Sequence, residues 1–400
     1  MLNVVGFGDF FKRGNPFYWQ MLNTQDPPIF SILDLFDSGE QGVWYDPDDL
    51  SSLYQDVTGS IPVTAAGQPV GLMLDKKFGL VRGNELAVNG NFENTSNWTL
   101  SVPVQISGSK LRFNSAFSNA NATQAGIVEA GKDYEISYTV DSVTSGSIGI
   151  EMLGVGGFIG PSISTAGTYK TILTAGANNS VSIVSKQAGT TAVIDNISVR
   201  ALPGSHAGIV TPSSKPILRF NATTGSYYLE VDGTDDWMST PAMPFSATDK
   251  VAAFAGIRKL NDTESVLFEL GTNVDSTNGS FAVLTGGTTQ KFRMSSRGTA
   301  TSTAAITDTA YNAPLSSVIH AVGDISGDLA SVAVNDSVTI TSATDQGTGN
   351  YGNHQLYLFR RNATSLYFSG NFYGMVLVGR LCTGSEQVSV KSILANKVGV

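Results

Sequence analysis

Acidic residues gather in one short segment, Tyr227–Ser239, with the sequence YYLEVDGTDDWMS. Glycoside hydrolases place two carboxylates across one cleft, one as nucleophile or base and the other as acid. Glu230 and Asp232 are two positions apart, so on a strand both would point the same way, and Asp235 and Asp236 follow shortly. The segment nevertheless has the pattern of a structural strand followed by a turn, and no Glu-x-Asp-x-x-Glu motif occurs. We therefore expect a protein that is not an enzyme.

The three histidines offer no second route to catalysis. His206 lies in a linker, His320 alternates with valines inside a strand, and His354 precedes a strand. None occupies a nucleophile elbow, and a single histidine on an apolar face is more often a hydrogen-bonded core residue than a base. Cys382 is the only cysteine, which excludes an intrachain disulfide and, with so few histidines, a His/Cys metal cluster.

Sugar binding is the chemistry that the aromatic residues could perform. A pyranose ring stacks on a flat aromatic face, and Asn, Asp or Gln side chains beside it bind the hydroxyl groups. The candidates are Phe158, Tyr169, Trp237 and Tyr351. Trp98 is a weaker candidate, because an aromatic residue shortly after the first strand of a domain more often belongs to its core.

The overall composition indicates an all-β protein without a nucleic-acid partner. The chain has 400 residues, which fits two or three domains, and only 14% are charged, which favours strands and turns over surface helices. The net charge of −9 opposes binding to a phosphate backbone. Residues 1–30 lack a basic segment followed by a continuous apolar run, so we expect neither a signal peptide nor a membrane span.

Alternation of apolar residues identifies two groups of strands and one helix. Residues 85–202 hold several alternating runs separated by turn signals, at the spacing of a β-sandwich. The pattern resumes after Pro216, and the run at residues 372–378 is apolar on both faces, which predicts a central strand. Thr383 and Glu386 form a capping box that begins a helix, and Gly399 ends it.

The N-terminal segment, residues 1–39, is rich in aromatic residues yet broken by Gly, Asn-Pro and Pro-Pro. It is too irregular to form a core, so its aromatic side chains must be buried against something else. We interpret it as an arm that attaches the protein to a partner; the alternative is an arm that wraps its own domain.

Two parts of the chain together resemble one known family. Residues 43–76 resemble the opening of a concanavalin A-like (laminin G type) domain common in bacteriophage structural proteins. In that family the Asp-Lys pair runs on directly to a His-Ala pair, a Pro-x-Leu-Arg strand and an Asp-Gly-x-Asp-Asp motif. Here these motifs appear only from His206 onward, and residues 370–400 resemble the closing strand and helix of the family.

The segment between these parts resembles a second family. Its two ends, NELAVNGNFENTSNWTLS and AVIDNISVRAL, are similar to the ends of a β-sandwich carbohydrate-binding module. A sandwich with adjacent termini can be inserted into a host loop without separating its ends. The expected domains are the arm at 1–39, a discontinuous sandwich at 40–82 plus 203–400, and an inserted sandwich at 83–202, both jelly-roll type and antiparallel.

The second resemblance implies that the inserted sandwich could hold a structural calcium ion. We expect no cofactor to be required. Modules of this shape often hold calcium between their first and last strands, through carboxylates and carbonyl oxygens. Asp195 alternates with Val193 and Ile197, where a lone carboxylate is costly unless it is satisfied, and Glu93 is the matching acid. The alternative is that hydrogen bonds from the backbone satisfy Asp195.

Together the resemblances imply a bacteriophage virion protein that is made in the host cytoplasm and adheres to host-surface glycans. The segment 1–39 would bind other virion proteins, and several copies, as a homo-oligomer or spread over the particle, would make weak sugar contacts effective. A tail-associated fibre or tip component is the first interpretation, and a capsid decoration protein (head fibre) is the alternative. A glycan-active hydrolase is the third.

Overall fold

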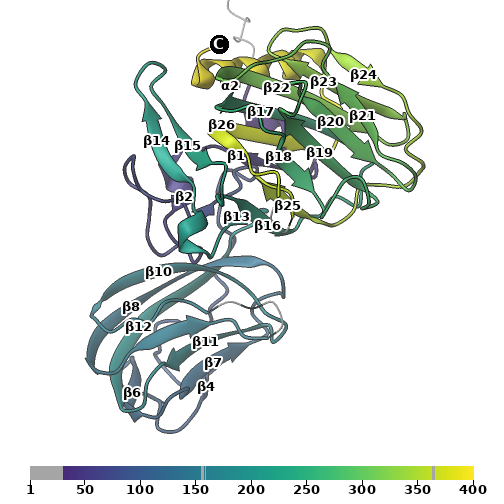
Figure 1. Cartoon of the computed structure of the whole chain (residues 1–400). Coiled ribbons are helices and arrows are strands. Elements are labelled where there is room, and N and C mark those ends of the chain that lie inside the picture. Colours follow the sequence, from purple (N-terminus) through teal and green to yellow (C-terminus); the bar gives the residue numbers. More distant parts are fainter. Residues whose placement is uncertain (1–29, 155–156, 158, 363–364) are drawn as a thin grey trace, which may run out of the picture.

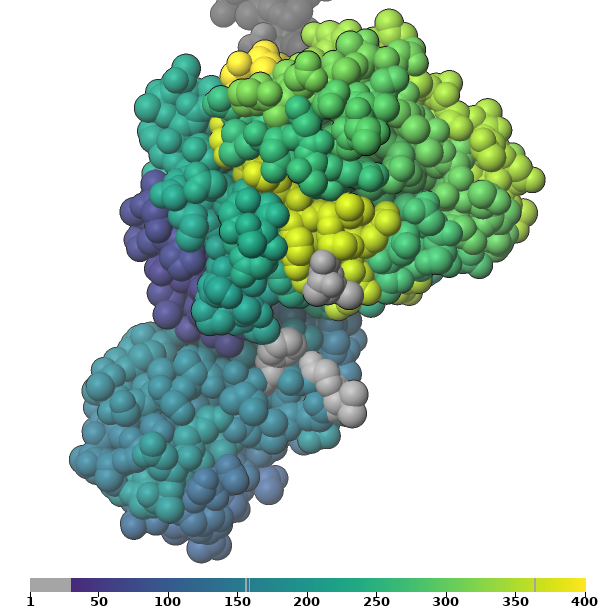
Figure 2. All heavy atoms as spheres, viewed as in Figure 1, coloured from purple at the N-terminus to yellow at the C-terminus, as the bar shows by residue number. Residues whose placement is uncertain are grey.

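The computed structural model describes residues 30–154, 157, 159–362 and 365–400. Within them the chain forms two β-sandwich bodies that meet at a narrow waist (Figures 1 and 2), and nearly every element is an antiparallel strand. The all-β fold class is therefore confirmed. In the part of the chain so described, no helix is both long and apolar enough to cross a membrane.

The larger body is built from two sheets, of which sheet I has eight strands. They are β1 (Gly42–Tyr45), β14 (Ile217–Asn221), β15 (Ser226–Asp232), β17 (Lys250–Lys259), β22 (Leu315–Asp324), β23 (Leu329–Val334), β24 (Ile340–Ser342) and β26 (Ser369–Val378). Their spatial order is β14-β15-β26-β17-β22-β23-β24, and β1 also pairs with β26. Strand β26 is central and almost wholly buried, as its two apolar faces predict.

Sheet II of the larger body has nine strands, in the order β2-β3-β13-β16-β25-β18-β19-β20-β21. They are β2 (Leu53–Tyr54), β3 (Leu72–Met73), β13 (Ala207–Gly208), β16 (Met238–Ala242), β18 (Ser265–Leu270), β19 (Ser280–Thr285), β20 (Arg293–Arg297), β21 (Thr303–Ile306) and β25 (Gln355–Leu358). Two short 3-10 turns lie between strands of the two sheets: η3 (Leu50–Ser52) between β1 and β2, and η4 (Pro212–Ser214) between β13 and β14.

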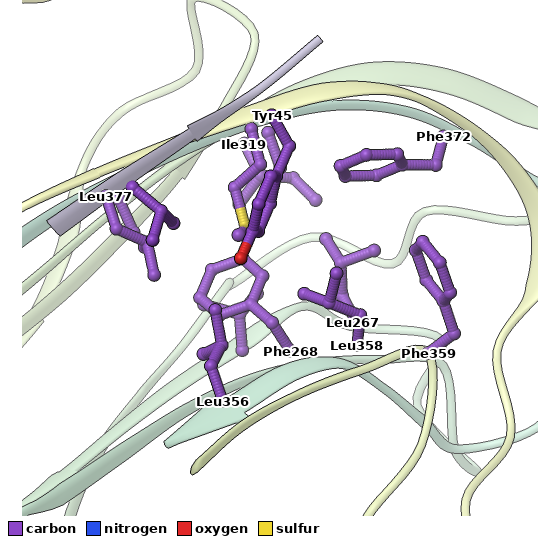
Figure 3. Packing of buried hydrophobic residues seen from close by; sticks show 14 of the residues in the cluster. Tyr45, Leu267, Phe268, Ile319, Leu356, Leu358, Phe359, Phe372 and Leu377 are labelled. Atoms are coloured by element: carbon purple, nitrogen blue, oxygen red, sulfur yellow. The ribbon is translucent and has the colours of Figure 1, made fainter. Parts of the chain in front are cut away.

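The core of the larger body lies between sheets I and II. Figure 3 shows Tyr45 and Leu377 of sheet I facing Phe268 and Leu356 of sheet II, and all four side chains are buried. Apolar burial of this kind contributes about 25 cal/mol per Å² and is the main stabilising contribution to such a sandwich.

The outer face of sheet I is covered by two helical elements. These are η2 (Ile32–Phe36) and the C-terminal helix α2 (Gly384–Val398). The capping box of α2 is formed as its sequence predicts, since the Thr383 hydroxyl accepts from the Glu386 amide while the Glu386 carboxylate accepts from the Thr383 amide. Gly399 ends the helix in the left-handed region, at φ 83°, which a glycine adopts without strain.

Residues 30–39 form part of this cover. Ile32, Leu35 and Phe36 are buried in one apolar cluster with α2 and the outer face of sheet I. Arg380 reinforces the contact through an ion pair with Glu40 (3.1 Å). The part of the expected arm from Ile32 to Phe36 is thus packed on the larger body, and residues 1–29 lie outside the described residues.

The smaller body contains a five-stranded sheet, III, in the order β10-β8-β12-β6-β5, and a four-stranded sheet, IV, in the order β4-β7-β11-β9. The strands are β4 (Thr99–Leu100), β5 (Gln105–Ile106), β6 (Leu111–Ala116), β7 (Asn121–Ala125), β8 (Asp133–Ser145), β9 (Ile148–Glu151), β10 (Gly167–Thr174), β11 (Ser180–Ser185) and β12 (Thr190–Ala201). Its core includes Phe92 and Trp98, whose ring centroids lie 5.2 Å apart.

The chain passes from one body to the other between two neighbouring strands. Strand β3 pairs with β13, so Leu72 lies opposite Gly208 although the whole smaller body separates them in sequence. The buried Asp75 carboxylate joins the two segments at which the chain leaves and re-enters the larger body. It accepts from the amides of Trp44 (3.0 Å), Lys77 (3.0 Å) and Ser205 (2.9 Å). Burial raises the pKa of Asp75 above its usual value, although Lys77 opposes the shift.

Direct contacts also join the two bodies. The Ile172 amide and the Thr171 hydroxyl both donate to the Thr58 carbonyl oxygen, at 2.5 and 2.9 Å. Ile172 is 5% exposed and shares a small apolar cluster with Tyr54, Leu72, Leu74 and Leu202. Strand β10 of the smaller body therefore packs against the region of β2 and β3 in the larger body.

Candidate functional site

A cleft of about 460 Å³ lies where the two sandwiches meet, within the usual size range of ligand pockets. Sheet II of the larger body forms one wall, through strands β13, β16 and β25, and strands β8 and β10 of the smaller body contribute to the other. The lining is mainly apolar. It comprises Val57, Leu72, Gly131, Asp133, Ile172, Thr174, His206, Gly208, Ile209, Val210, Trp237, Ser239, Thr240, Pro241 and Gln355.

Trp237 is the aromatic residue of this cleft. It immediately precedes β16, and its amide donates to the Ser214 carbonyl oxygen at 3.2 Å. The Arg360 guanidinium lies over the indole ring, 3.3 Å from its centroid. Such a cation–π contact gains strength as the groups are withdrawn from water, and Arg360 is buried. The indole is thereby held in one orientation at the edge of the cleft.

Polar groups beside Trp237 are available to a ligand. The Gln355 side-chain oxygen accepts from the Tyr357 hydroxyl at 2.6 Å, whereas its NH₂ group makes no hydrogen bond within the described residues. The Ser239 hydroxyl also has no partner in the described part of the chain. By contrast, the Thr240 hydroxyl is engaged, because it accepts from the Leu356 amide at 3.0 Å. Gln355 and Ser239 are thus the free hydrogen-bonding groups on this wall.

The opposite wall carries a carboxylate and an imidazole. Asp133 accepts from the Thr174 hydroxyl, and its second oxygen lies 4.0 Å from Nε2 of His206. Nδ1 of His206 accepts from the Asp75 amide at 3.0 Å, which places the proton on Nε2, directed toward the Leu202 carbonyl oxygen at 3.2 Å. His206 thus lies in the linker between β12 and β13, as expected, and its ring joins the two segments at which the chain passes between the bodies.

The structure places the four aromatic candidates in different surroundings. Trp237 lines the cleft. Tyr169 stands at the rim of the smaller sandwich, where its ring lies 5.8 Å from that of Tyr138 and its hydroxyl bonds to Thr165. Phe158 lies outside the described residues. The expectation for Tyr351 is wrong, because this residue is 1% exposed and offers no face to a sugar.

The two candidate calcium ligands have other partners. Asp195 forms ion pairs with Lys110, whose Nζ is also 3.0 Å from Asp141, and accepts from the Asn196 amide at 2.8 Å. Glu93 is exposed and accepts from the Asn91 side chain at 2.9 Å. The Asp195 carboxylate is thus satisfied by the Lys110 ammonium and the Asn196 backbone amide. The alternative to calcium named only backbone hydrogen bonds as its partners.

The acidic residues before Trp237 are engaged in contacts within the larger body. Glu230 is paired with Arg219 at 2.9 Å on the neighbouring strand. Asp232, the last residue of β15, forms a close cluster with Asp235 and Asp236, and Asp236 accepts from the Asp232 amide at 2.9 Å. Burial is the main cause that raises the pKa of Asp236 to about 6, and the neighbouring carboxylates add to the shift. The hydrogen bonds from the Asp232 amide to Asp236 and from the Thr234 amide to Asp232 hold the turn.

Several residues in or beside the cleft carry no sequence signal. Arg360 follows β25 in a loop, and neither its charge nor its position indicates that it stacks on Trp237. Ile172 has the pattern of an ordinary strand residue. Gln355 and Ser239 stand on adjacent strands, and this proximity follows only from the pairing of β16 with β25.

Comparisons with known proteins find distant similarity among solved structures. No family model matches the sequence, and no curated protein matches it. Among solved structures, the CBM40 domain of Ruminococcus gnavus IT-sialidase, bound to α2,3-sialyllactose, is 13% identical. The match covers 36% of this chain and 83% of that one, with a TM-score of 0.30.

Two further structures are similar over more of the chain. The tandem CBM22 domains of Paenibacillus barcinonensis Xyn10C are 12% identical over 74% of this chain and 98% of that chain, with a TM-score of 0.26. Domains LG4–5 of the mouse laminin α1 chain are 11% identical over 70% and 92%, with a TM-score of 0.28. These neighbours are carbohydrate-binding modules and laminin G domains, and the phage origin implied by the sequence motifs has no counterpart among them.

Proposed function

We propose that this protein binds glycans in the cleft between its two sandwiches and does so without hydrolysing them. The observation that carries the proposal is the arrangement of Trp237, which Arg360 holds flat at 3.3 Å beside the free polar groups of Gln355 and Ser239. An aromatic plate flanked by hydrogen-bonding groups is the arrangement that binds a pyranose ring.

The size of the cleft supports a short saccharide as the ligand. A cleft of about 460 Å³ accommodates one or two sugar units rather than a long chain. Its apolar wall, which includes Ile172 and the exposed Val210, would contact the less polar face of a sugar ring. Since each such contact is weak, display of several copies on one particle would supply the affinity.

We further propose that the protein is a bacteriophage virion component that adheres to the host surface. The order of the sequence motifs at residues 43–76, 205–239 and 370–400 supports this proposal. Because residues 32–36 are packed on the larger body, attachment to other virion proteins is assigned to the segment that precedes them. A tail-associated fibre or tip is preferred, and a capsid decoration protein is the alternative. Labelling virions with an antibody against the smaller body would distinguish tail from head.

The binding proposal is tested with a glycan array and two matched variants. Trp237→Ala removes the aromatic plate, whereas Phe220→Ala removes an exposed aromatic residue, 47% accessible, on the distant β14–β15 hairpin. We expect Trp237→Ala to abolish array binding and Phe220→Ala to leave it unchanged. Equal binding by wild type and both variants would exclude the cleft, and release of reducing sugar from a bound glycan would exclude the non-enzymatic assignment.

A further inference from the structure

A second, smaller pocket lies on the larger body, on the outer face of sheet II near β19 and β20. Its volume is about 130 Å³, and its lining is mainly polar. The lining residues come from β19, β20, β21 and the loop that joins β19 to β20, with Glu264 just before β18. None of these residues lines the cleft that contains Trp237.

Arg293 lies in this pocket with part of its hydrogen-bonding capacity unused. The strand register places it opposite Leu284 on one side and Ile306 on the other, so its aliphatic stem is flanked by apolar side chains. One terminal nitrogen lies 3.4 Å from the Glu264 carboxylate. The Nε–H is buried and has no partner among the described residues. A buried donor without an acceptor is costly, which indicates a site prepared for one.

The loop above Arg293 adds a second cation and polar groups. Lys291 lines the pocket, together with the exposed Thr288 and Thr289. Gly286 has φ +84°, and a Cβ there would lie 2.3 Å from the Thr263 carbonyl oxygen, so only glycine permits this loop shape. The amides of Thr288 and Thr289, two residues that line the pocket, make no hydrogen bond within the residues that the structure describes.

The charge and size of the pocket select the ligand class. Two cations, Lys291 and Arg293, face one carboxylate, Glu264, so this pocket is cationic in a chain whose net charge is −9. Its 130 Å³ corresponds to roughly four water molecules. This space admits a carboxylate or sulfate group but not a whole sugar ring. Guanidinium groups bind such oxyanions through paired N–H donors.

We propose that this pocket binds the oxyanion substituent of an acidic saccharide, a carboxylate or a sulfate ester, while the sugar ring remains outside. The proposal rests on the proposed glycan-binding function for the saccharide part of its ligand. It adds a second contact point on sheet II, separate from the Trp237 cleft, and it predicts a preference for acidic over neutral glycans.

The test compares three small probes by isothermal titration at low and moderate salt: methyl β-glucuronide, methyl β-glucoside and acetate. We expect wild-type protein to bind the glucuronide, more weakly at higher salt, and to bind the glucoside at least tenfold more weakly at this pocket. A loss of about tenfold, equivalent to about 1.4 kcal/mol, is expected for Arg293→Gln, because the variant loses the charge-assisted hydrogen bonds of the guanidinium. Glu264→Gln should strengthen binding, because it removes the competing carboxylate.

Arg219→Gln is the matched control, since Arg219 is also a strand arginine paired with a glutamate, on sheet I. It should leave glucuronide binding unchanged. Equal affinity for glucuronide and glucoside, or unchanged binding in Arg293→Gln and Glu264→Gln, would overturn the proposal. Acetate binding as tight as the glucuronide would reject the saccharide part. Trp237→Ala should leave glucuronide binding intact, which separates failure of this pocket from failure of the cleft.

Discussion

The guanidinium carbon of Arg360 lies 3.3 Å from the centre of the Trp237 indole ring. The two residues are distant in sequence, because Trp237 lies between β15 and β16 and Arg360 between β25 and β26. They nevertheless form one stacked unit beside the cleft. Arg360 also approaches the Tyr367 hydroxyl at 3.5 Å, while its Nε has no partner within the described residues. The stacking with Trp237 is therefore its principal contact.

Replacing Arg360 should weaken glycan binding through Trp237. We expect Arg360→Ala to reduce affinity roughly fivefold, equivalent to about 1 kcal/mol, because the indole loses the cation that fixes its orientation. Arg360→Lys should recover only part of the loss, since an ammonium does not stack as a planar guanidinium does. Tryptophan fluorescence, with Trp237→Phe as the reference, would report the changed environment. An affinity unchanged in both variants would contradict this role.

The contact between the two bodies should be necessary for the cleft. Ile172→Ala removes apolar contacts in the cluster with Tyr54 and Leu72, at a cost of about 2–4 kcal/mol. We expect this variant to lose glycan binding while both sandwiches remain folded, because the lost contacts join the bodies rather than fill either core. Small-angle scattering would show a more extended particle.

Val102→Ala is the control for this substitution, since Val102 is 80% exposed on the smaller body. It should change neither the scattering curve nor the binding. A compact Ile172→Ala variant with normal affinity would show that the Thr58 hydrogen bonds alone preserve the cleft.

Much of the architecture was predictable because it depends on local patterns. The capping box at Thr383 and Glu386 forms as expected, since both partners are three residues apart and need no distant element. The double apolar pattern of β26 likewise predicted a strand covered on both faces, and α2 and sheet II supply the two covers. In both cases the residues that determine the structure lie close together in the sequence.

The candidate site was much less predictable, because its residues meet through tertiary packing. Tyr351 stands between glycines and asparagines, a context typical of an exposed loop. The loop is nevertheless held inside, as the Tyr351 amide donates to the Thr248 carbonyl oxygen at 2.9 Å and its hydroxyl pairs with Ser296 at 2.7 Å. Trp237 was a candidate from its type alone, whereas Arg360 and Ile172 became candidates only from the coordinates.

Calcium should have little effect on the stability of the smaller body. The Asp195 carboxylate already has the Lys110 ammonium and the Asn196 amide as partners, so a cation would have to displace Lys110. We expect the melting temperature of the wild type to be the same in EDTA and in millimolar calcium. A melting temperature that rises with calcium, and no longer does so in Asp195→Asn and Glu93→Gln, would instead support the structural ion implied by the sequence resemblance.

Acid should destabilise the larger body through His320. This imidazole stacks on Phe254 at 4.5 Å, and its Nε2 is buried without a partner among the described residues. Burial is the main cause that lowers the pKa of His320 from 6.5 to about 4, and Lys391 on α2 adds to the shift. Between these two values the unfolded chain binds a proton that the folded protein excludes. Stability is therefore full above pH 6.5 and falls as the pH decreases to 4.

The variant His320→Phe isolates this effect, because phenylalanine keeps the stacking surface and cannot be protonated. Asp236 titrates in the same range with the opposite sign, since its raised pKa of about 6 makes stability fall as the pH rises. The difference in unfolding free energy between His320→Phe and wild type cancels that contribution. We expect it to grow by up to about 3 kcal/mol from pH 7.5 to pH 4, measured by urea denaturation. A difference that is independent of pH would show that His320 is protonated equally easily in the folded and unfolded states.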